Sequence, residues 1–486
     1  MQKGIVALIA VIGLFLSFSC PNVEASQGHA SASSLSGFVN LLDLKEGKGV
    51  HSVAWSPDGS KIAVGDDSGI MSIYDSSSGV LLKQFTPHKN AVSAISWSKQ
   101  GRVATGSYDN TVKIWDSSDW KQVGDTIQNH TNQVWDVAWS ADGNELTSSG
   151  KDGKIFTYSP DAKYLSEMET TVTGLARAVS WEPAGDFLVG FIQDDFTNKP
   201  IIYKWSASSG KIKKQLAINV TAYDISWDSK GSLVGVTLEN GSVMLIEPDL
   251  FVPQRFIPVS ASALYTIAWG TGDSKNEMVL AGNDKTIYTA TSIGNKTGNI
   301  TNAHSDIIMA IALSPNGTMY ASGSRDAHAK VWGDPHPQIV WHVPVSDAKN
   351  VSVMSNITIK FDRKMDEPSL RAAMTLQTAL FNILVRNNNT YAVIEPQGKL
   401  AYEARFTVSI KSSAKGMVGG NMSADFSFMF TTENSPASPA LDIPWLWVGV
   451  AVLVILIIII IAVLASRRRA GKRILPQRER RHGADR

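Results

Sequence analysis

A tryptophan that returns at almost constant spacing is the feature of this 486-residue chain that most restricts its fold. Trp97 ends the segment AISW, and similar segments end in Trp five more times, while a seventh copy, AIAL, ends in Leu313. The gaps between the seven positions are 42, 42, 42, 46, 42 and 44 residues. Spacing this steady indicates a repeat architecture, in which each repeat is one supersecondary unit. The six tryptophans are Trp55, Trp97, Trp139, Trp181, Trp227 and Trp269.

Each repeat carries the signals of short antiparallel strands. A turn glycine follows soon after the tryptophan in most copies, as in SPDG at Gly59 and SADG at Gly143. A turn glycine between two alternating runs indicates a β-hairpin. Four short strands in about 42 residues are typical of one propeller blade. We therefore predict an all-β fold that begins with a seven-bladed β-propeller over residues 36–336.

The seventh repeat lacks its own last strand, because the period ends near Pro335 after three strands. The segment FVNLLDLKEG, residues 38–47, precedes the first repeat and has the pattern of a strand. We expect residues 36–47 to close the ring by pairing with residues 305–333. Closure would remove an open sheet edge, which is otherwise a site of aggregation.

The chain resembles the WD-repeat family over residues 36–336. Trp115-Asp116 is the fullest match to the signature pair, and Tyr74-Asp75 is a weaker one. The resemblance implies a buried hydrogen-bonded tetrad in three repeats, made of His88, Thr105, Asp109 and Trp115, of His130, Ser148, Asp152 and Tyr158, and of His304, Ser322, Asp326 and Trp332. Because the set recurs, it indicates structure and not Ser-His-Asp hydrolysis. The first, fourth, fifth and sixth repeats lack the set, and we expect them to rest on apolar packing.

Residues 337–433 break the period and form a second domain. Alternating apolar positions in NITIKF, RFTVSI and FSFMF predict several short strands, typical of a β-sandwich. The pattern from Ile357 to Asp366 is similar to that of bacterial Ig-like domains, with Asp362 where those domains usually have Ser. The resemblance implies a stalk, with a second ligand site as the alternative.

The chain ends predict a membrane protein. Residues 1–25 have the short basic start, apolar run and small residues of a signal peptide, although an uncleaved anchor is the alternative. Residues 445–465 carry no charge, and as a helix they would span about 31 Å, which matches a bilayer core. Residues 434–444 form a proline-containing linker. The single cysteine, Cys20, lies in a poor lipoprotein motif and excludes an intramolecular disulfide.

The charge distribution indicates which side of the membrane each part occupies. The residues from Arg467 onward carry nine Lys or Arg and two Asp or Glu, a net +7, so the rest of this +1 chain has a net charge of −6. The positive-inside rule then makes residues 466–486 a cytoplasmic tail. We therefore expect a single-pass cell-membrane protein of a prokaryotic, archaeal surface, with its bulk extracytoplasmic. Ten Asn-x-Ser/Thr sequons in that bulk favour a glycoprotein.

A set of candidate partner-binding residues follows from the resemblance. In this family, the residue four before the repeat tryptophan opens the innermost strand at the mouth of the central channel. Three of these positions hold aromatic rings and one holds Arg, which is typical of a recognition hot spot. The seven residues are His51, Ser93, Trp135, Arg177, Tyr223, Tyr265 and Met309.

The motifs favour binding over catalysis. The chain has no P-loop, no His-Glu-x-x-His and no paired-cysteine motif, so we expect no enzyme activity, cofactor or metal. A net charge of +1 argues against nucleic acid as a partner. We predict a membrane-anchored scaffold that binds a protein or glycan at the channel mouth. A propeller-based hydrolase or lyase and a structural cell-envelope component are the alternatives.

Overall fold

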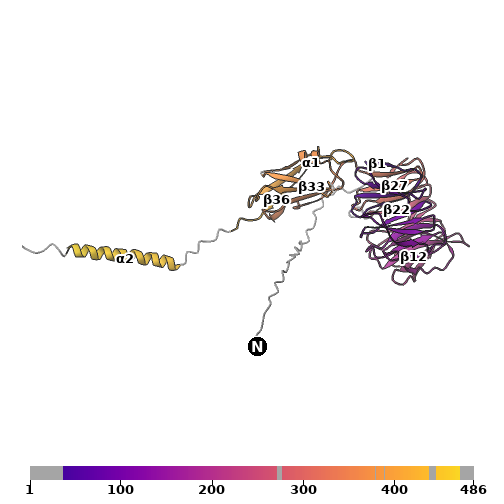
Figure 1. Cartoon of the computed structure of the whole chain (residues 1–486), viewed down its shortest axis with the longest axis horizontal. Coiled ribbons are helices and arrows are strands. Elements are labelled where there is room, and N and C mark those ends of the chain that lie inside the picture. Colours follow the sequence, from indigo (N-terminus) through magenta and orange to yellow (C-terminus); the bar gives the residue numbers. More distant parts are fainter. Residues whose placement is uncertain (1–36, 271–275, 378, 388, 437–444, 471–486) are drawn as a thin grey trace, which may run out of the picture. The chain divides into compact units, whose positions relative to one another are not determined.

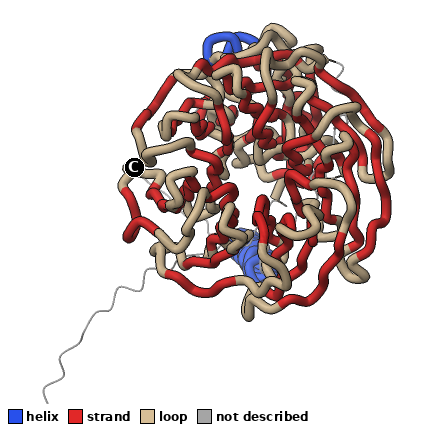
Figure 2. The backbone as a smooth tube through the Cα atoms, turned by 90° about the vertical axis from the view of Figure 1, so that its right-hand side faces the viewer, coloured by secondary structure: helices blue, strands red, loops and turns tan. Residues whose placement is uncertain are grey.

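The computed structural model describes residues 37–270, 276–377, 379–387, 389–436 and 445–470. The predicted signal peptide, residues 437–444 of the linker and residues 471–486 of the basic tail lie outside this part. The described chain is mostly β-structure, with a short helix α1 (Glu367–Ala373) and a long apolar helix α2 (Trp445–Ala470) (Figure 1). Figure 2 shows the same composition, with strands and loops throughout and helix confined to two places.

The strands of the described residues form nine four-stranded sheets, and seven of these come from the repeat region. We number these seven as sheets 1 to 7 in chain order. Sheet 1 consists of β2 (Val50–Trp55), β3 (Lys61–Asp66), β4 (Met71–Asp75) and β5 (Leu81–Phe85). Sheet 2 consists of β6 (Val92–Trp97), β7 (Arg102–Ser107), β8 (Val112–Asp116) and β9 (Gln122–Ile127). Sheet 3 consists of β10 (Val134–Trp139), β11 (Leu146–Gly150), β12 (Ile155–Tyr158) and β13 (Tyr164–Glu167).

The remaining repeat sheets have the same antiparallel order. Sheet 4 consists of β14 (Gly174–Trp181), β15 (Phe187–Asp194), β16 (Pro200–Ser206) and β17 (Ile212–Ala217). Sheet 5 consists of β18 (Ala222–Trp227), β19 (Val234–Leu238), β20 (Ser242–Glu247) and β21 (Val252–Pro258). Sheet 6 consists of β22 (Leu264–Trp269), β23 (Glu277–Gly282), β24 (Ile287–Thr291) and β25 (Lys296–Ile300). Sheet 7 consists of β26 (Ile308–Leu313), β27 (Met319–Ser324), β28 (His328–Gly333) and β1 (Val39–Lys45).

Sheet 7 joins the two ends of the repeat region. β1 pairs antiparallel with β28, with Leu44 opposite Ala329 and Asp43 opposite Lys330. The first strand of each sheet contacts the first strand of the next, and β26 of sheet 7 contacts β2 of sheet 1. The sheets therefore follow one another in a closed cycle, in which β1 covers the edge that β28 would otherwise expose.

The repeat tryptophan ends the first strand of six sheets and ties neighbouring sheets together. The indole Nε1 of Trp55 donates to the carbonyl of Ala312, at 3.1 Å. Trp181 and Trp269 donate in the same way to residues of the preceding sheet, at 3.1 Å and 3.0 Å. Each acceptor directly precedes the equivalent residue of the preceding repeat. The bond is not general, because Nε1 of Trp139 and of Trp227 is buried without a hydrogen-bond partner among the described residues.

Close packing between sheets also requires a small residue in the second strand. A side chain on Gly106 of sheet 2 would place its Cβ 2.8 Å from Val134 of sheet 3. A Cβ on Gly65 of sheet 1 would lie 2.7 Å from Val92 of sheet 2. These separations are shorter than van der Waals contact, so glycine lets the valine of the next sheet pack against the backbone.

Two further sheets form the region after the repeats. One has the order β29 (Ile339–Val343), β31 (Ile357–Phe361), β34 (Tyr391–Pro396), β33 (Phe381–Arg386). The other has the order β30 (Ala348–Val351), β36 (Phe426–Thr432), β35 (Arg405–Ile410), β32 (Met374–Leu376). The predicted inward positions are buried, since Ile359 and Val408 are fully buried and Phe428 is 3 % exposed. They belong to one hydrophobic cluster that joins both sheets.

Helix α1 was not predicted from the sequence. It begins where the carboxylate of Asp366 accepts a hydrogen bond from the backbone N–H of Ser369, with Pro368 in the first turn. Both features stabilise a helix start. The helix has only seven residues and lies between segments with the alternating pattern of strands, so the sequence pattern did not reveal it. Its buried residues are Leu370 and Ala373.

Polar contacts link the second region to the repeat sheets. Lys364 forms an ion pair with Asp75 of sheet 1. The side-chain amide of Asn316 donates to the Asp362 carbonyl at 3.0 Å. Because this amide nitrogen is already bonded, the sequon at Asn316 is a poor site for a glycan.

Helix α2 was predicted as residues 445–465 and runs to Ala470. Its segment Val448–Ser466 is the one stretch of the described chain that is long and apolar enough to cross a membrane, by length and composition alone.

Candidate partner-binding site

The structure brings all seven predicted partner-binding residues together. His51, Ser93, Trp135, Arg177, Tyr223, Tyr265 and Met309 line a single cavity of about 390 Å³. Each comes from the first strand of a different sheet. From the sequence we expected each of them to be the first residue of its strand, and this is not the case. Six are the second residue of the strand, and Arg177 is the fourth residue of the longer strand β14.

Each of the seven residues lies at an irregularity in the strand pairing. In β10 the register passes from Val134 to Asp136 and omits Trp135. In β14 it passes from Ala176 to Ala178 and omits Arg177. The other five first strands show the same shift at the corresponding position. A bulge of this kind frees one residue from the ladder and redirects its side chain. The repeated bulge therefore explains why seven side chains converge.

Four more residues line the cavity that sequence reasoning missed, namely Tyr108, Gln133, Ile307 and Arg325. Tyr108 and Arg325 each follow the second strand of their sheet, and their backbone N–H groups donate to Ala91 and Ile307. The same backbone bond occurs in all seven repeat sheets, at Asp67, Tyr108, Lys151, Asp195, Glu239, Asn283 and Arg325. Alignment of the repeats at this turn position would have identified this second ring.

Arg177 lies between aromatic rings at the centre of the site. Its guanidinium carbon is 5.0 Å from the ring centre of Trp135 and 5.3 Å from that of Tyr223. Tyr223 packs edge-on against Tyr265, with ring centres 4.7 Å apart. The three rings and the cation form one continuous cluster, in which cation–π attraction holds the guanidinium in place.

Arg177 is only partly compensated by this environment. Its Nε atom is buried and has no hydrogen-bond partner among the described residues. Burial lowers the pKa of Arg177, and the nearby tyrosines Tyr223, Tyr108 and Tyr265 act in the opposite direction. A buried donor without a partner is unusual in a folded protein and calls for an explanation. Here it leaves a cation with free N–H groups at the mouth.

The other predicted residues contribute in different ways. His51 is 8 % exposed, and its Nε2 lies 2.6 Å from the Asp67 carboxylate. The Ser93 hydroxyl donates to the carbonyl of Val134 at 2.7 Å, so it joins sheets 2 and 3. The indole of Trp135 donates to the Gln133 side chain at 3.2 Å. These bonds hold the lining in place and leave the ring faces to form the wall.

Two buried carboxylates follow the bulge in sheets 3 and 5. Asp136 accepts backbone N–H bonds from Val137 and Val179, at 2.8 Å and 3.0 Å. Asp224 accepts in the same way from Ile225 and Ile267, at 2.8 Å and 2.9 Å. Burial, reinforced by the charge of Asp224, raises the pKa of Asp136 to about 7.

Burial also raises the pKa of Asp224, to about 6, while its hydrogen bonds lower it. Each of the two carboxylates accepts a hydrogen bond from the first strand of the following sheet. Both residues keep some exposed surface. They therefore link neighbouring sheets below the mouth.

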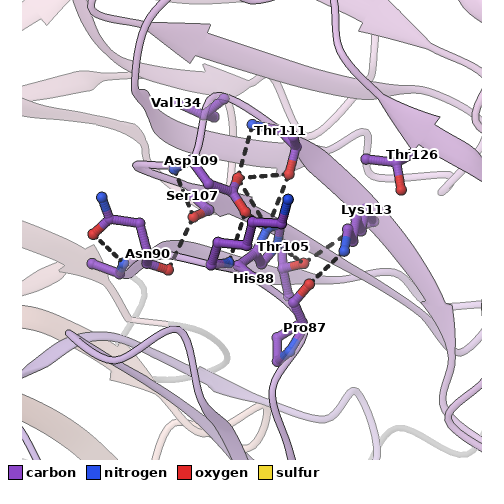
Figure 3. A network of polar contacts seen from close by, with 12 residues as sticks. Pro87, His88, Asn90, Thr105, Ser107, Asp109, Thr111, Lys113, Thr126 and Val134 are labelled. Atoms are coloured by element: carbon purple, nitrogen blue, oxygen red, sulfur yellow. Dashed lines mark hydrogen bonds and ion pairs between the residues drawn. The ribbon is translucent and has the colours of Figure 1, made fainter.

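The three tetrads implied by the resemblance are present. In sheet 2, His88 bonds Asp109 through Nδ1 at 3.1 Å and Thr105 through Nε2 at 2.7 Å (Figure 3). The indole of Trp115 also donates to Thr105, at 3.0 Å. Sheets 3 and 7 repeat the network around His130 and His304, although in sheet 3 the contact of Ser148 with the Tyr158 hydroxyl is long, at 3.5 Å.

The buried histidine of sheet 7 is held uncharged. Burial lowers the pKa of His304 to about 4, against the opposing effect of Asp326. His304 is 2 % exposed, and its Nε2 lies 2.7 Å from the Ser322 hydroxyl. The geometry of a neutral, buried histidine in a repeated network agrees with a structural role.

The expectation of purely apolar packing in sheets 1, 4, 5 and 6 was wrong for three of them. In sheet 1 the Tyr74 hydroxyl donates to buried Glu46 at 2.8 Å. In sheet 4 the Tyr203 hydroxyl bonds Thr171 at 2.7 Å, and in sheet 6 the Tyr288 hydroxyl donates to Asp284 at 2.6 Å. A tyrosine in the third strand brings a hydroxyl into the core, and that hydroxyl requires a partner.

No group of three or more His, Cys, Asp and Glu in the described ranges could hold a metal ion. The nearest approach to a catalytic pair is His51, which lines the cavity, with Asp67, which lies outside the lining. The only serine of the lining, Ser93, donates its hydroxyl to Val134.

Comparison with known proteins agrees with this architecture. The model of the WD domain, G-beta repeat, matches residues 40–75, 79–116, 121–159 and 295–333. The model of the bacterial Ig-like domain matches residues 334–432. The chain therefore contains WD40 repeats, which are typical of a β-propeller. It also carries a bacterial Ig-like domain, which the sandwich-type strand pattern had indicated.

Curated relatives share the repeats over part of their length. A ribosome biogenesis protein WDR12 homolog of Drosophila erecta is 24 % identical over 212 residues, 40 % of this chain and 50 % of that protein. The WDR12 homolog of Trichoplax adhaerens is 39 % identical over 85 residues, 16 % of this chain and 20 % of that protein. An intraflagellar transport protein 122 homolog of Homo sapiens is 36 % identical over 69 residues, 14 % of this chain and 6 % of that protein. The chain thus spans at most half the length of these relatives.

These relatives correct the predicted location. Proteins named for ribosome biogenesis share the repeats, so the prediction of a cell-membrane protein with an extracytoplasmic bulk was wrong. That prediction rested on an apolar helix and flanking charge, and such a helix by length and composition is weak evidence for a membrane span. The predicted signal peptide, glycoprotein character and prokaryotic surface origin likewise gain no support, since the relatives described above are animal proteins.

Proposed function

We propose that this protein is a non-enzymatic interaction scaffold whose propeller mouth binds a protein partner. In this proposal sheets 1 to 7 are the blades of one seven-bladed ring, and the two remaining sheets are an Ig-like sandwich. The cyclic contacts between first strands and the pairing of β1 with β28 support the ring. The hydrophobic cluster that spans both later sheets supports the sandwich.

The observation that carries the proposal is the cavity built by the seven bulge residues. Three aromatic rings and a partly buried arginine meet there, each from the first strand of a different sheet. Interface hot spots are enriched in Trp, Tyr and Arg that lie in a pocket near the centre of the contact. A volume of about 390 Å³ is large enough to receive side chains from a partner loop.

The geometry favours a protein partner over a glycan. A sugar ring binds by stacking on an open aromatic face, whereas Arg177 lies over the rings of Trp135 and Tyr223. Tyr223 and Tyr265 are packed edge to face against each other. The WDR12 relatives are named for ribosome biogenesis, and their repeats support a scaffold role.

The second candidate, a hydrolase or lyase, has one supporting feature, the His51–Asp67 pair. A hydrolase of this type would need a nucleophile within reach of the histidine. The Ser93 hydroxyl instead donates to the Val134 carbonyl. We therefore assign the pair to positioning of the lining.

A photo-cross-linking experiment tests the proposal. A benzoylphenylalanine is placed at Met309 in the mouth or, as a control, at Leu82 on the exposed outer strand β5, in the full-length chain. We expect a discrete protein adduct from extracts of the source cells at Met309 and none at Leu82. Trp135→Ala combined with Tyr265→Ala should reduce the adduct at least tenfold, the effect of losing a hot spot.

The control is thermal unfolding of the same variants. A melting temperature close to that of the parent shows that the two rings serve binding and not the core. The proposal fails if Met309 and Leu82 give the same adducts, or if the double variant unfolds with the loss of binding. If a glycosidase removes the cross-linked partner and a protease does not, the partner is a glycan and the proposal of a protein partner is wrong.

A further inference from the structure

The cavity at the mouth is lined by hydrogen-bond donors that lack an acceptor. The hydroxyls of Tyr108, Tyr223 and Tyr265 make no hydrogen bond to any residue in the described part of the chain. The same holds for the guanidinium groups of Arg177 and Arg325. Guanidinium groups can only donate. The lining therefore calls for a ligand that accepts several hydrogen bonds.

The arginine at the centre can use only its edge for this contact. The Trp135 and Tyr223 rings lie 5.0 Å and 5.3 Å from its guanidinium carbon, and its Nε is buried. The edge of a planar guanidinium pairs with a carboxylate through two parallel N–H···O bonds. Desolvation strengthens such a pair when a partner arrives.

The lining supplies no carboxylate of its own. None of its eleven residues is Asp or Glu. Asp67 lies nearby, but its Oδ1 is 2.6 Å from His51 Nε2. Glu239 acts on Arg177 through space and forms no ion pair with it among the described residues. No carboxylate in the described part of the chain forms an ion pair with Arg177 or Arg325.

We propose that the mouth binds an acidic peptide segment, with one Asp or Glu carboxylate of the partner accepting hydrogen bonds from the edge of Arg177 and from Arg325. The peptide chain beside that side chain packs on Tyr265 and Met309. The inference rests on the proposed function and names the chemistry of the partner. Of the two arginines in the lining, Arg177 is partly buried, with its Nε fully buried, and Arg325 is exposed.

The test uses peptides of known sequence. A displayed library of random twelve-residue peptides is selected on the full-length chain, and the enriched peptides are synthesised with each Glu or Asp as such or replaced by Gln or Asn. Fluorescence polarisation then measures binding to the parent, to Arg177→Gln, to Arg325→Gln and to Lys151→Gln. Lys151 belongs to the second ring but does not line the cavity, so it is the matched control.

We expect at least tenfold weaker binding for the amide peptide and for Arg177→Gln, several-fold weaker binding for Arg325→Gln, and no change for Lys151→Gln. Arg325 is exposed, so its variant tests the proposal even if Arg177→Gln unfolds. Peptides that bind equally as acid and amide, or that bind tighter when Glu is replaced by phosphoserine, would overturn the acidic-side-chain assignment. If Trp135→Ala with Tyr265→Ala leaves every selected peptide bound, the proposed function fails as well.

Discussion

At the scale of single residues, one position of the repeat acquires different chemistry around the ring. The residue after the bulge is Asp136 in sheet 3, Asp224 in sheet 5 and Thr266 in sheet 6. All three accept a backbone N–H from the first strand of the following sheet, and for Thr266 the donor is Ile311, at 3.2 Å. The bond between sheets is therefore common to all three, while the ionisable group is an addition that costs stability when it is charged and buried.

The pKa of Asp136 leads to a prediction about pH. Its folded pKa of about 7 lies above its ordinary value of 3.8, so between these values the folded chain holds a proton that the unfolded chain has released. The free energy of unfolding should then fall as pH rises from about 4 to 7, by up to about 1.4 kcal/mol per pH unit from this group. Asp136→Thr imitates Thr266, so it should keep the bond to Val179 and remove this loss.

Denaturant unfolding of the parent and Asp136→Thr at pH 5 and pH 8 measures the effect. We subtract the free energy of unfolding of the parent from that of Asp136→Thr. We expect this difference to be larger at pH 8 than at pH 5. The difference between the two proteins isolates Asp136, because every other ionisable group is present in both. A difference that does not change with pH would show that Asp136 is already ionised in the folded chain at pH 5.

At the scale of elements, the first strand of each sheet does two things. Its bulge directs one side chain into the mouth, and its terminal tryptophan bonds the preceding sheet. The two tasks lie four residues apart, so the tryptophan marks the site residue in the sequence. The tryptophans are not equivalent, however, because Trp139 Nε1 is buried without a hydrogen-bond partner, whereas Trp181 Nε1 donates to Ala138.

This difference predicts unequal effects of the same substitution. Trp139→Phe and Trp181→Phe remove similar volume at positions that are both 8 % exposed. Only Trp181→Phe breaks a hydrogen bond between sheets, so it should lower the free energy of unfolding by about 1 kcal/mol more than Trp139→Phe. Urea unfolding of both variants measures the difference, and equal losses would assign the role of the tryptophan to packing alone.

At the scale of the whole molecule, the ring depends on a strand far away in sequence. β1 precedes the first repeat but pairs with β28, the last strand of the repeat region. Buried Leu44 of β1 packs in one cluster with Val50 of sheet 1 and Val331 of sheet 7. Opening the pairing of β1 with β28 would expose a sheet edge and remove Leu44 from this cluster.

A disulfide across the closure tests this arrangement. Asp43 lies opposite Lys330, so Asp43→Cys with Lys330→Cys, in a Cys20→Ser background, should oxidise readily. The bridge closes a loop of nearly the whole propeller and should raise the free energy of unfolding by about 2 to 4 kcal/mol. Mobility on non-reducing gels and thermal unfolding, with and without reductant, measure both effects.

The offset pair Lys45→Cys with Lys330→Cys is the control. Lys45 pairs with His328, two residues along, which is too far for an unstrained bridge to position 330. Equal oxidation of both pairs would mean that β1 does not hold the observed register.

The sequence by itself determined the period and, through it, the hairpins, because each hairpin depends on residues close together in the chain. The period also left the last repeat one strand short, and this predicted the strand at residues 36–47. It also named seven residues that share one cavity, although their role in binding stays a prediction. Only the tertiary structure showed the bulges, the second ring with Tyr108 and Arg325, and the contact of Glu46 with Tyr74. These depend on which distant segments pack together, as does the raised pKa of Asp136, which burial and then the charge of Asp224 create.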